Sequence, residues 1–202
     1  LLGLFRDRLL AGTFFGGQEW QLDVYFAAFR IPDMIFQLLV LGVLSAAFIP
    51  VFSHYLEKEK EEAYHLSSSV INFLLVFFIL FAILVFIFAE PLIKLIAPAF
   101  DPVEISLMVS LARIMLLAQL FFCFSIFLTG VIQSHQRFLV PALSPIAYNL
   151  GIIFGIIVLS RWLGIYGPTI GVVIGAFFHL IIQLPLALKL GFRYSFVFDW
   201  HH

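Results

Sequence analysis

The sequence predicts an all-α integral membrane protein built as a bundle of six transmembrane helices. Of the 202 residues, 63% are hydrophobic and 11% are charged, whereas a soluble domain has about 45–50% apolar and about 25% charged residues. The mean hydropathy is +1.11. A chain with so little charge cannot cover a surface that faces water, so its surroundings must be lipid. Several segments without Asp, Glu, Lys or Arg reach the roughly 20 residues that a membrane-crossing helix needs.

These uncharged segments define the expected helices in order. They are 34–56, 63–89, 114–136, 138–160 and 162–188, preceded by an incomplete one at the start of the chain. Because lipid cannot satisfy backbone hydrogen bonds, helix is the structure that these lengths favour. With their flanks, we expect helices at about 1–16, 22–56, 66–97, 102–133, 138–160 and 167–190, in one lobe that covers 1–193. Residues 194–202 are interpreted as the start of a further segment or the remnant of a tag.

The connections between the helices indicate the orientation. The charge run 57–62 (EKEKEE) is interpreted as a solvated helix end or loop. Lys and Arg gather in 57–65, 133–138 and from 189 onward, and connections rich in these residues stay in the cytoplasm. Both ends of the segment are therefore expected on the cytoplasmic side.

Glycines at helical spacing predict close packing of the fifth and sixth helices. Gly151 and Gly155 are four residues apart, and so are Gly167, Gly171 and Gly175. Small residues at this spacing let two helix backbones approach each other in a membrane. We assign these glycines a packing role and no chemistry.

Four arginines fall inside the expected spans, namely Arg6, Arg8, Arg30 and Arg113. A rise of about 1.5 Å per residue places Arg6, Arg30 and Arg113 roughly 12–16 Å below the outer ends of three different helices. A charge that faces lipid costs at least ~2.5–3.5 kcal/mol, so we expect these arginines to face one water-filled cavity. Guanidinium groups bind phosphate oxygens through paired hydrogen bonds. Such a cavity favours a phosphate-bearing or otherwise anionic substrate.

Two aspartates can partner these cations. Asp7 follows Arg6 directly, and Asp33 lies three residues after Arg30, on the same helical face. One interpretation is a structural salt-bridge cluster that pins the first helix to the second. The other is that the aspartates position the arginines, whose number leaves an excess of positive charge for a substrate.

Other polar residues carry weaker signals. His179 and Gln183 are one turn apart in the sixth helix and form either a polar relay or a simple hydrogen-bonded pair. Asn149 and Gln119 are expected to make hydrogen bonds between helices. The sequence has no H-E-x-x-H, no G-x-S-x-G and no glycine-rich phosphate loop. We therefore expect no enzyme, no catalytic residue, no metal and no cofactor.

Short motifs along the chain resemble one transporter family. They are GLFRD at 3–7, AAFRIP at 27–32 and SAAFIPV at 45–51, followed by Asn149 and QLP at 183–185. These motifs are similar to those of the MurJ (MviN) family of lipid II flippases, in the multidrug/oligosaccharidyl-lipid/polysaccharide exporter superfamily. The resemblance covers the entire chain in order.

The resemblance implies a two-lobe transporter with a cationic cavity between the lobes. Members move the lipid-linked peptidoglycan precursor across the bacterial cytoplasmic membrane by alternating access, which supports cell-wall biogenesis and cell shape. This chain would be the N-terminal lobe, without the start of its first helix and without the C-terminal lobe. The family's cavity arginine falls on Arg6, with Asp7 after it, and its basic position before Ile-Pro falls on Arg30.

The chain also departs from the family pattern. A second cavity arginine falls on Phe36, the family's glutamate falls on Leu41, and Asp33 replaces an asparagine. The alternatives are an exporter of another polyprenyl-linked oligosaccharide, a cation-coupled drug antiporter of the same superfamily, or a non-transporting membrane scaffold. The expected partners are lipid II or a related polyprenyl-pyrophosphate glycan, membrane lipids and the C-terminal lobe, with no nucleic acid.

Overall fold

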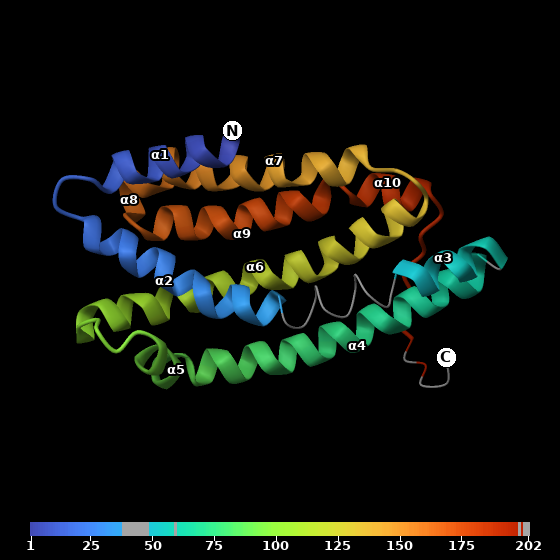
Figure 1. The fold of residues 1–202 in the computed structure, drawn as a ribbon, viewed down its shortest axis with the longest axis horizontal. Coiled ribbons are helices and arrows are strands. Elements are labelled where there is room, and N and C mark those ends of the chain that lie inside the picture. The colour runs from blue at the N-terminus through green and yellow to red at the C-terminus, as the bar shows by residue number, and fades with distance from the viewer. Residues whose placement is uncertain (38–48, 59, 198, 200–202) are drawn as a thin grey trace.

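The computed structural model describes residues 1–37, 49–58, 60–197 and 199, and within them the chain folds as a bundle of helices (Figure 1). The elements are α1 (Leu2–Phe14), α2 (Glu19–Phe36), α3 (Ile49–Lys58), α4 (Lys60–Ile87), α5 (Ala89–Ile96), α6 (Pro102–Ser134), α7 (Leu139–Phe154), a π-helical turn (Gly155–Leu159), α8 (Ser160–Leu163), α9 (Tyr166–Ile181) and α10 (Leu184–Lys189). The predicted all-α class is confirmed.

Four helical stretches are long and apolar enough to cross a membrane. They are Glu61–Ile87, Pro102–Ser134, Leu139–Leu163 and Tyr166–Lys189. Of the other two predicted spans, 1–16 corresponds to the 13-residue α1. The remaining one, 22–56, includes 38–48, which lies outside the described residues. The count of six spans therefore stays a prediction.

Helix α6 is the centre of the bundle. It packs against α2 and α9 over much of its length, and against α4 and α5 on another side (Figure 1). Buried residues occur along its whole length, and the side chains of Leu111, Met115 and Ala118 are fully buried. Helix α9 lies between α6 and α7, and α1 packs on α7. This arrangement leaves α4 at the edge of the bundle with a largely exposed apolar face.

The start of α6 was predictable because its capping residues are adjacent in sequence. Asp101 accepts hydrogen bonds from the backbone N–H groups of Val103 and Glu104, at 2.8 and 2.9 Å, and Glu104 accepts one in return from the Asp101 N–H at 2.9 Å. Pro102 occupies the first turn, where a missing N–H costs nothing. Such a reciprocal cap satisfies donors that the helix itself leaves free.

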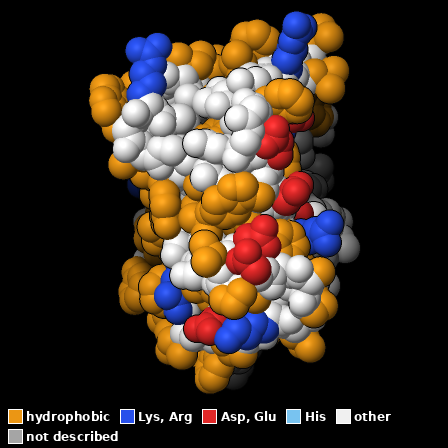
Figure 2. All heavy atoms as spheres, turned by 90° about the vertical axis from the view of Figure 1, so that its left-hand side faces the viewer, with side chains coloured by type: hydrophobic (Ala, Val, Ile, Leu, Met, Phe, Trp, Pro, Cys, Tyr) orange, Lys and Arg blue, Asp and Glu red, His pale blue; other side chains and the backbone are white. Residues whose placement is uncertain are grey.

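The turn between α1 and α2 relies on two glycines. Gly16 and Gly17 have φ values of 104° and 119°, a region that suits glycine because it has no Cβ. Both N–H groups donate to the Glu19 carboxylate at 2.8 Å. These backbone hydrogen bonds, from Gly16 first, lower the pKa of Glu19 below its ordinary value. Figure 2 looks onto this end of the bundle and shows acidic and basic side chains among hydrophobic ones.

Two predicted boundaries in the 57–97 region were wrong. The helix expected at 66–97 begins already at Lys60 and is divided at Phe88 into α4 and α5. Glutamates in the first turn of α4 favour the early start, because anions stabilise helix N-termini. Pro91 explains the break, since it cannot donate to the carbonyl of Ile87 and its ring crowds that group. The charge run 57–62 therefore belongs largely to helix ends.

The predicted close packing of the glycine-rich helices is confirmed. A Cβ atom added to Gly151 would lie 2.4 Å from the backbone of Gly175, and one added to Gly155 would lie 2.5 Å from the carbonyl oxygen of Gly167. Only hydrogen fits at such distances. The backbones of α7 and α9 therefore touch along this seam.

The chain after α10 runs extended along α4 and is held by its backbone. Asn72 donates to the carbonyl oxygens of Ser195 and Val197, at 3.1 and 2.8 Å. The N–H groups of Ser195 and Asp199 donate to the hydroxyls of Ser68 and Ser69, at 3.1 and 2.8 Å. All three α4 side chains are buried. We call Ser68, Ser69 and Asn72 the α4 clamp.

Candidate functional site

Arg6 is fixed on α1 by two oxygen-bearing side chains. Its Nε and Nη2 atoms donate to Asp7 Oδ1 at 2.9 and 2.8 Å, and Nη1 donates to Asn149 Oδ1 on α7 at 3.1 Å. The Asn149 amide is itself oriented, because its Nδ2 donates to the Pro145 carbonyl oxygen at 2.7 Å. The Arg6 side chain keeps 26% of its surface exposed. A guanidinium held this way is oriented and still accessible.

A small hollow adjoins Arg6 between α1, α2 and α7. Its volume is about 160 Å³, and its lining residues are Arg6, Asp7, Leu10, Tyr25, Phe26, Phe29, Tyr148 and Ile152. Tyr25 packs edge-on against both Phe26 and Phe29, with ring centroids 5.6 and 5.2 Å apart. The hollow thus places the Arg6 guanidinium near packed aromatic side chains of α2.

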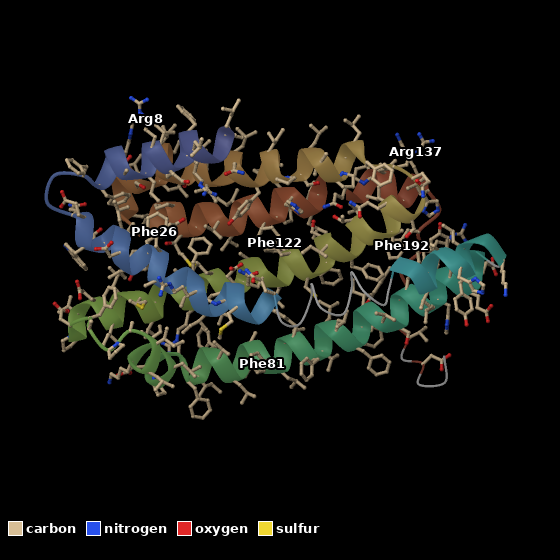
Figure 3. The ribbon with its side chains drawn as sticks, viewed as in Figure 1. Arg8, Phe26, Phe81, Phe122, Arg137 and Phe192 are labelled. Carbon is tan, nitrogen blue, oxygen red and sulfur yellow. The ribbon has the colours of Figure 1, made fainter. Side chains whose placement is uncertain are left out.

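Arg30 lines a larger hollow between α2, α5 and α6. This hollow has a volume of about 370 Å³ and also contains Asp23 and Phe26. Phe26 is common to the hollows of Arg6 and Arg30, so these two hollows are neighbours on α2 (Figure 3). Arg30 is exposed and has no ion-pair partner in the described part of the chain.

The two aspartates, Asp7 and Asp33, have different kinds of partner. Asp7 pairs with Arg6, as expected, at 2.8 Å. Asp33 accepts a hydrogen bond from the Gln37 amide at 2.7 Å, and no ion pair joins it to Arg30 among the described residues. A shared helical face is therefore not enough here to pair Asp33 with Arg30, and the Asp33 carboxylate instead accepts from the side chain one turn later.

The other two arginines lie away from these hollows. Arg8 is exposed on α1 and points away from the bundle (Figure 3). Arg113 extends from α6 to α4, where its Nε donates to the Phe86 carbonyl oxygen at 3.0 Å and its guanidinium carbon lies 4.8 Å from the Phe86 ring centre. The structure thus brings Arg6 and Arg30 into hollows that share Phe26, and puts Arg113 in a hollow that shares Phe100 with that of Arg30.

His179 and Gln183 belong to a polar cluster between α6 and α9. The Ser125 hydroxyl lies 2.5 Å from His179 Nδ1, Gln183 Nε2 donates to Ser125 Oγ at 2.7 Å, and Thr129 donates to Gln183 Oε1 at 2.8 Å. Gln183 is fully buried. Sequence reasoning missed Ser125 and Thr129, which are four residues apart on α6 and face His179 of α9 and Gln183, the residue before α10.

The metal-ligating side chains do not cluster in the described residues. Within the ranges that the structure describes, no group of three His, Cys, Asp or Glu side chains could hold a metal ion.

Sequence reasoning also missed the α4 clamp, whose signal is the polar run SSSVIN at 67–72 inside an apolar segment. Phe36 lies at the end of α2, while Leu41 falls outside the described residues.

Comparison with known proteins identifies the family. The family model described as "Lipid II flippase MurJ" matches residues 12–202. The probable lipid II flippase MurJ of Buchnera aphidicola subsp. Acyrthosiphon pisum is 31% identical over 210 residues, which cover 100% of this chain and 40% of that protein. The lipid II flippase MurJ of Thermosipho africanus is 33% identical, over 90% of this chain and 38% of that protein.

A solved structure agrees with these relatives. The lipid II flippase MurJ in an inward closed conformation superposes with a TM-score of 0.81 at 32% identity, covering 97% of this chain and 41% of that one. This chain thus spans about 40% of the length of the relatives that it matches. Because the family model covers nearly the entire chain, the chain belongs to the MurJ lipid II flippase family.

Proposed function

We propose that this chain is the N-terminal lobe of a flippase that carries lipid II across the bacterial cytoplasmic membrane by alternating access. The family match along 12–202 supports the cargo. The coverage of about 40% of the relatives supports a further lobe that completes the transporter. Both ends of the segment lie in the cytoplasm in this proposal, and membrane lipids and the C-terminal lobe are its partners.

The observation that carries the proposal is the geometry at Arg6. A free arginine has five N–H donors in a planar fork, which matches the oxygens of a phosphate group. Asp7 and Asn149 take some of these donors and set the plane of the group. The remaining N–H groups are available to the pyrophosphate of lipid II. We propose that Asp7 releases part of its hold on Arg6 when the anion arrives.

Arg30 provides a second positive charge beside the first. It has no described carboxylate partner, and its hollow shares Phe26 with that of Arg6. A pyrophosphate could therefore move between the two arginines as the lobes rock, with Asp33 as an alternative partner for Arg30. Arg8 adds to the positive potential at α1, and the His179–Gln183 cluster joins α6 to α9 as a polar relay.

The test replaces Arg6 in the full-length protein. Arg6→Ala is expected to abolish rescue of cells depleted of their own flippase, while the amount of protein in the membrane stays normal. Arg161→Ala, an exposed arginine in α8 far along the chain from the hollows, is the matched control and is expected to rescue. Normal rescue by Arg6→Ala would remove the role given to this arginine.

The cargo is tested separately with the purified full-length protein in liposomes. Lipid II is expected to cross faster than a polyprenyl pyrophosphate that carries an unrelated glycan. Equal rates for both lipids would contradict the assignment of lipid II as the specific cargo, without affecting the role of Arg6 in binding the pyrophosphate.

A further inference from the structure

A furrow runs along the side of α6 that faces α4 and α5, and it is polar at one end and apolar at the other. The polar part has a volume of about 360 Å³ and is lined by Ser106, Ser110 and Arg113 of α6, with Glu90 and Lys94 of α5 opposite. The apolar part has a volume of about 450 Å³ and lies between α4 and α6. Arg113 lines both parts and marks the point where they meet.

The apolar part is made almost entirely of hydrocarbon. Besides Arg113 its walls are aliphatic or aromatic, and Ile79, Ile83 and Phe86 of α4 are among them. Ile83 is 50% exposed, and so is Phe86. Half-exposed apolar side chains such as these suit contact with acyl chains, and the groove is open on this side. The seven helical steps from Arg113 to Leu120 of α6 give the apolar part a length of roughly 10 Å.

Charge in the polar part is unbalanced at Arg113. Lys94 is paired with Glu90 at 2.7 Å, and the hydrogen bond and charge of Lys94 lower the pKa of Glu90, which lies beyond the end of the α4 span. Arg113 has no carboxylate partner among the described residues. Its Nε is bonded to the Phe86 carbonyl oxygen, which leaves its Nη groups without a described acceptor. Cations in a membrane pair with anions or backbone carbonyls, and the charge of Arg113 also adds, after the effects of Lys94, to the lowered pKa of Glu90. The Nη groups are still suited to bind an anion.

We propose that this furrow binds an anionic phospholipid from the surrounding membrane. The headgroup phosphate accepts hydrogen bonds from the Arg113 Nη groups, in the paired geometry that guanidinium favours. One acyl chain lies in the groove between α4 and α6. The second chain remains in the bilayer, against the exposed face of α4. This assignment does not depend on the proposed function, because Arg113 lines neither the hollow of Arg6 nor that of Arg30, although Phe100 lines both the Arg30 hollow and the polar part of the furrow.

The occupant follows from the match of shape and charge. A neutral lipid such as a diacylglycerol would leave Arg113 without an anion near the headgroup level. A zwitterionic lipid would bring an ammonium group close to Arg113 and Lys94. An anionic headgroup such as phosphatidylglycerol satisfies Arg113 and presents hydroxyls near Ser106 and Ser110, which line the same hollow.

The test measures lipid binding to the full-length protein in detergent micelles by native mass spectrometry. Phosphatidylglycerol and phosphatidylethanolamine with identical acyl chains are titrated separately. The wild-type protein is expected to bind phosphatidylglycerol about tenfold more tightly at this position, in keeping with one charge-assisted hydrogen-bonded contact. Arg113→Gln is expected to remove that preference. Arg161→Gln, which removes the same charge from an exposed position in α8, is expected to keep it.

A second variant separates the charge from the groove. Ile83→Trp keeps Arg113 and fills the apolar part, so it is expected to lower the occupancy of phosphatidylglycerol as well. Thermal unfolding of each variant verifies that it remains folded. The proposal is overturned if wild-type protein binds both lipids equally, if Arg113→Gln retains the preference, or if Ile83→Trp binds as much phosphatidylglycerol as the wild-type protein. Loss of lipid II binding by Arg113→Gln with unchanged phosphatidylglycerol binding would overturn it too, and would assign Arg113 to the cargo.

Discussion

At the scale of single residues, Asn149 is the group that turns Arg6 from a mobile cation into an oriented one. Its Oδ1 accepts from Arg6 and its Nδ2 is committed to the Pro145 carbonyl oxygen. The Pro145 carbonyl lies one turn before Asn149, so the amide is anchored to its own helix while its oxygen faces Arg6. One amide thus links α1 to α7 and sets the plane of the guanidinium.

Replacing Asn149 should therefore weaken transport more than it weakens folding. Asn149→Leu in the full-length protein is expected to lower the initial rate of lipid II transfer in liposomes by about tenfold, the size of one lost hydrogen bond to a charged group. Asn149→Asp is the matched variant, because it keeps an acceptor for Arg6, and it is expected to retain most of the rate. An equal loss in both variants would show that the hydrogen bond to Arg6 is not the reason.

The candidate site could be predicted only where the partners are neighbours in sequence. Asp7 was assigned to Arg6 because the two residues are adjacent, and the structure pairs them. Asp33 was assigned to Arg30 on helical spacing, but Gln37 holds its carboxylate. Ser125 and Thr129 were missed because each has its hydrogen-bond partner 54 residues later in the sequence, His179 for Ser125 and Gln183 for Thr129. Such contacts depend on how the helices pack, which local patterns do not contain.

At the scale of elements, the seam between α7 and α9 holds two spans at backbone contact. Its glycines were recognisable in the sequence because spacing alone signals a smooth helix face. The start of α6 was equally predictable, since Asp101 and Glu104 form a cap within four residues. The division at Phe88 was missed although Pro91, three residues later, was a visible signal for it, because the helix was extended past this proline to 97.

Adding a single methyl group to this seam is expected to cost stability. Gly151→Ala places a Cβ 2.4 Å from the Gly175 backbone, and backbone atoms cannot move aside as a flexible side chain can. The expected loss is about 1–3 kcal/mol, typical of overpacking, seen as a lower midpoint of thermal unfolding in detergent. Gly12→Ala is the control, because nothing lies within 4 Å of its added Cβ. A normal midpoint for Gly151→Ala would mean that α7 and α9 are farther apart.

At the scale of the whole molecule, the bundle has charged side chains at its ends and an apolar belt between them. The exposed large hydrophobic residues of α4 run from Val76 to Phe88 with few interruptions. This belt explains why the composition alone was enough to predict a membrane protein. Composition does not determine how the bundle is oriented, so the orientation rests on the distribution of Lys and Arg.

Cysteine labelling of intact cells can measure this orientation. In the full-length protein with its other accessible cysteines replaced, Arg161→Cys is expected to react with a membrane-impermeant maleimide added outside. Arg137→Cys, at the other end of the bundle (Figure 3), is expected to react only after permeabilisation. Cys123 is buried and gives little background. The reverse pattern would place both ends of the segment outside the cytoplasm.

The α4 clamp has a consequence for how this protein can diverge. Ser68, Ser69 and Asn72 mostly bond peptide groups in the segment after α10, so side chains that the clamp does not touch can change while the path stays the same. Tyr194 is an exception, because its hydroxyl donates to Asn72 Oδ1 at 2.6 Å. Proline is a further exception at 195 and 199, since it would remove an N–H that the clamp requires. Selection on the route by which the chain leaves this lobe therefore acts on a helix more than 100 residues upstream, and related proteins should preserve the clamp while their exit segments differ.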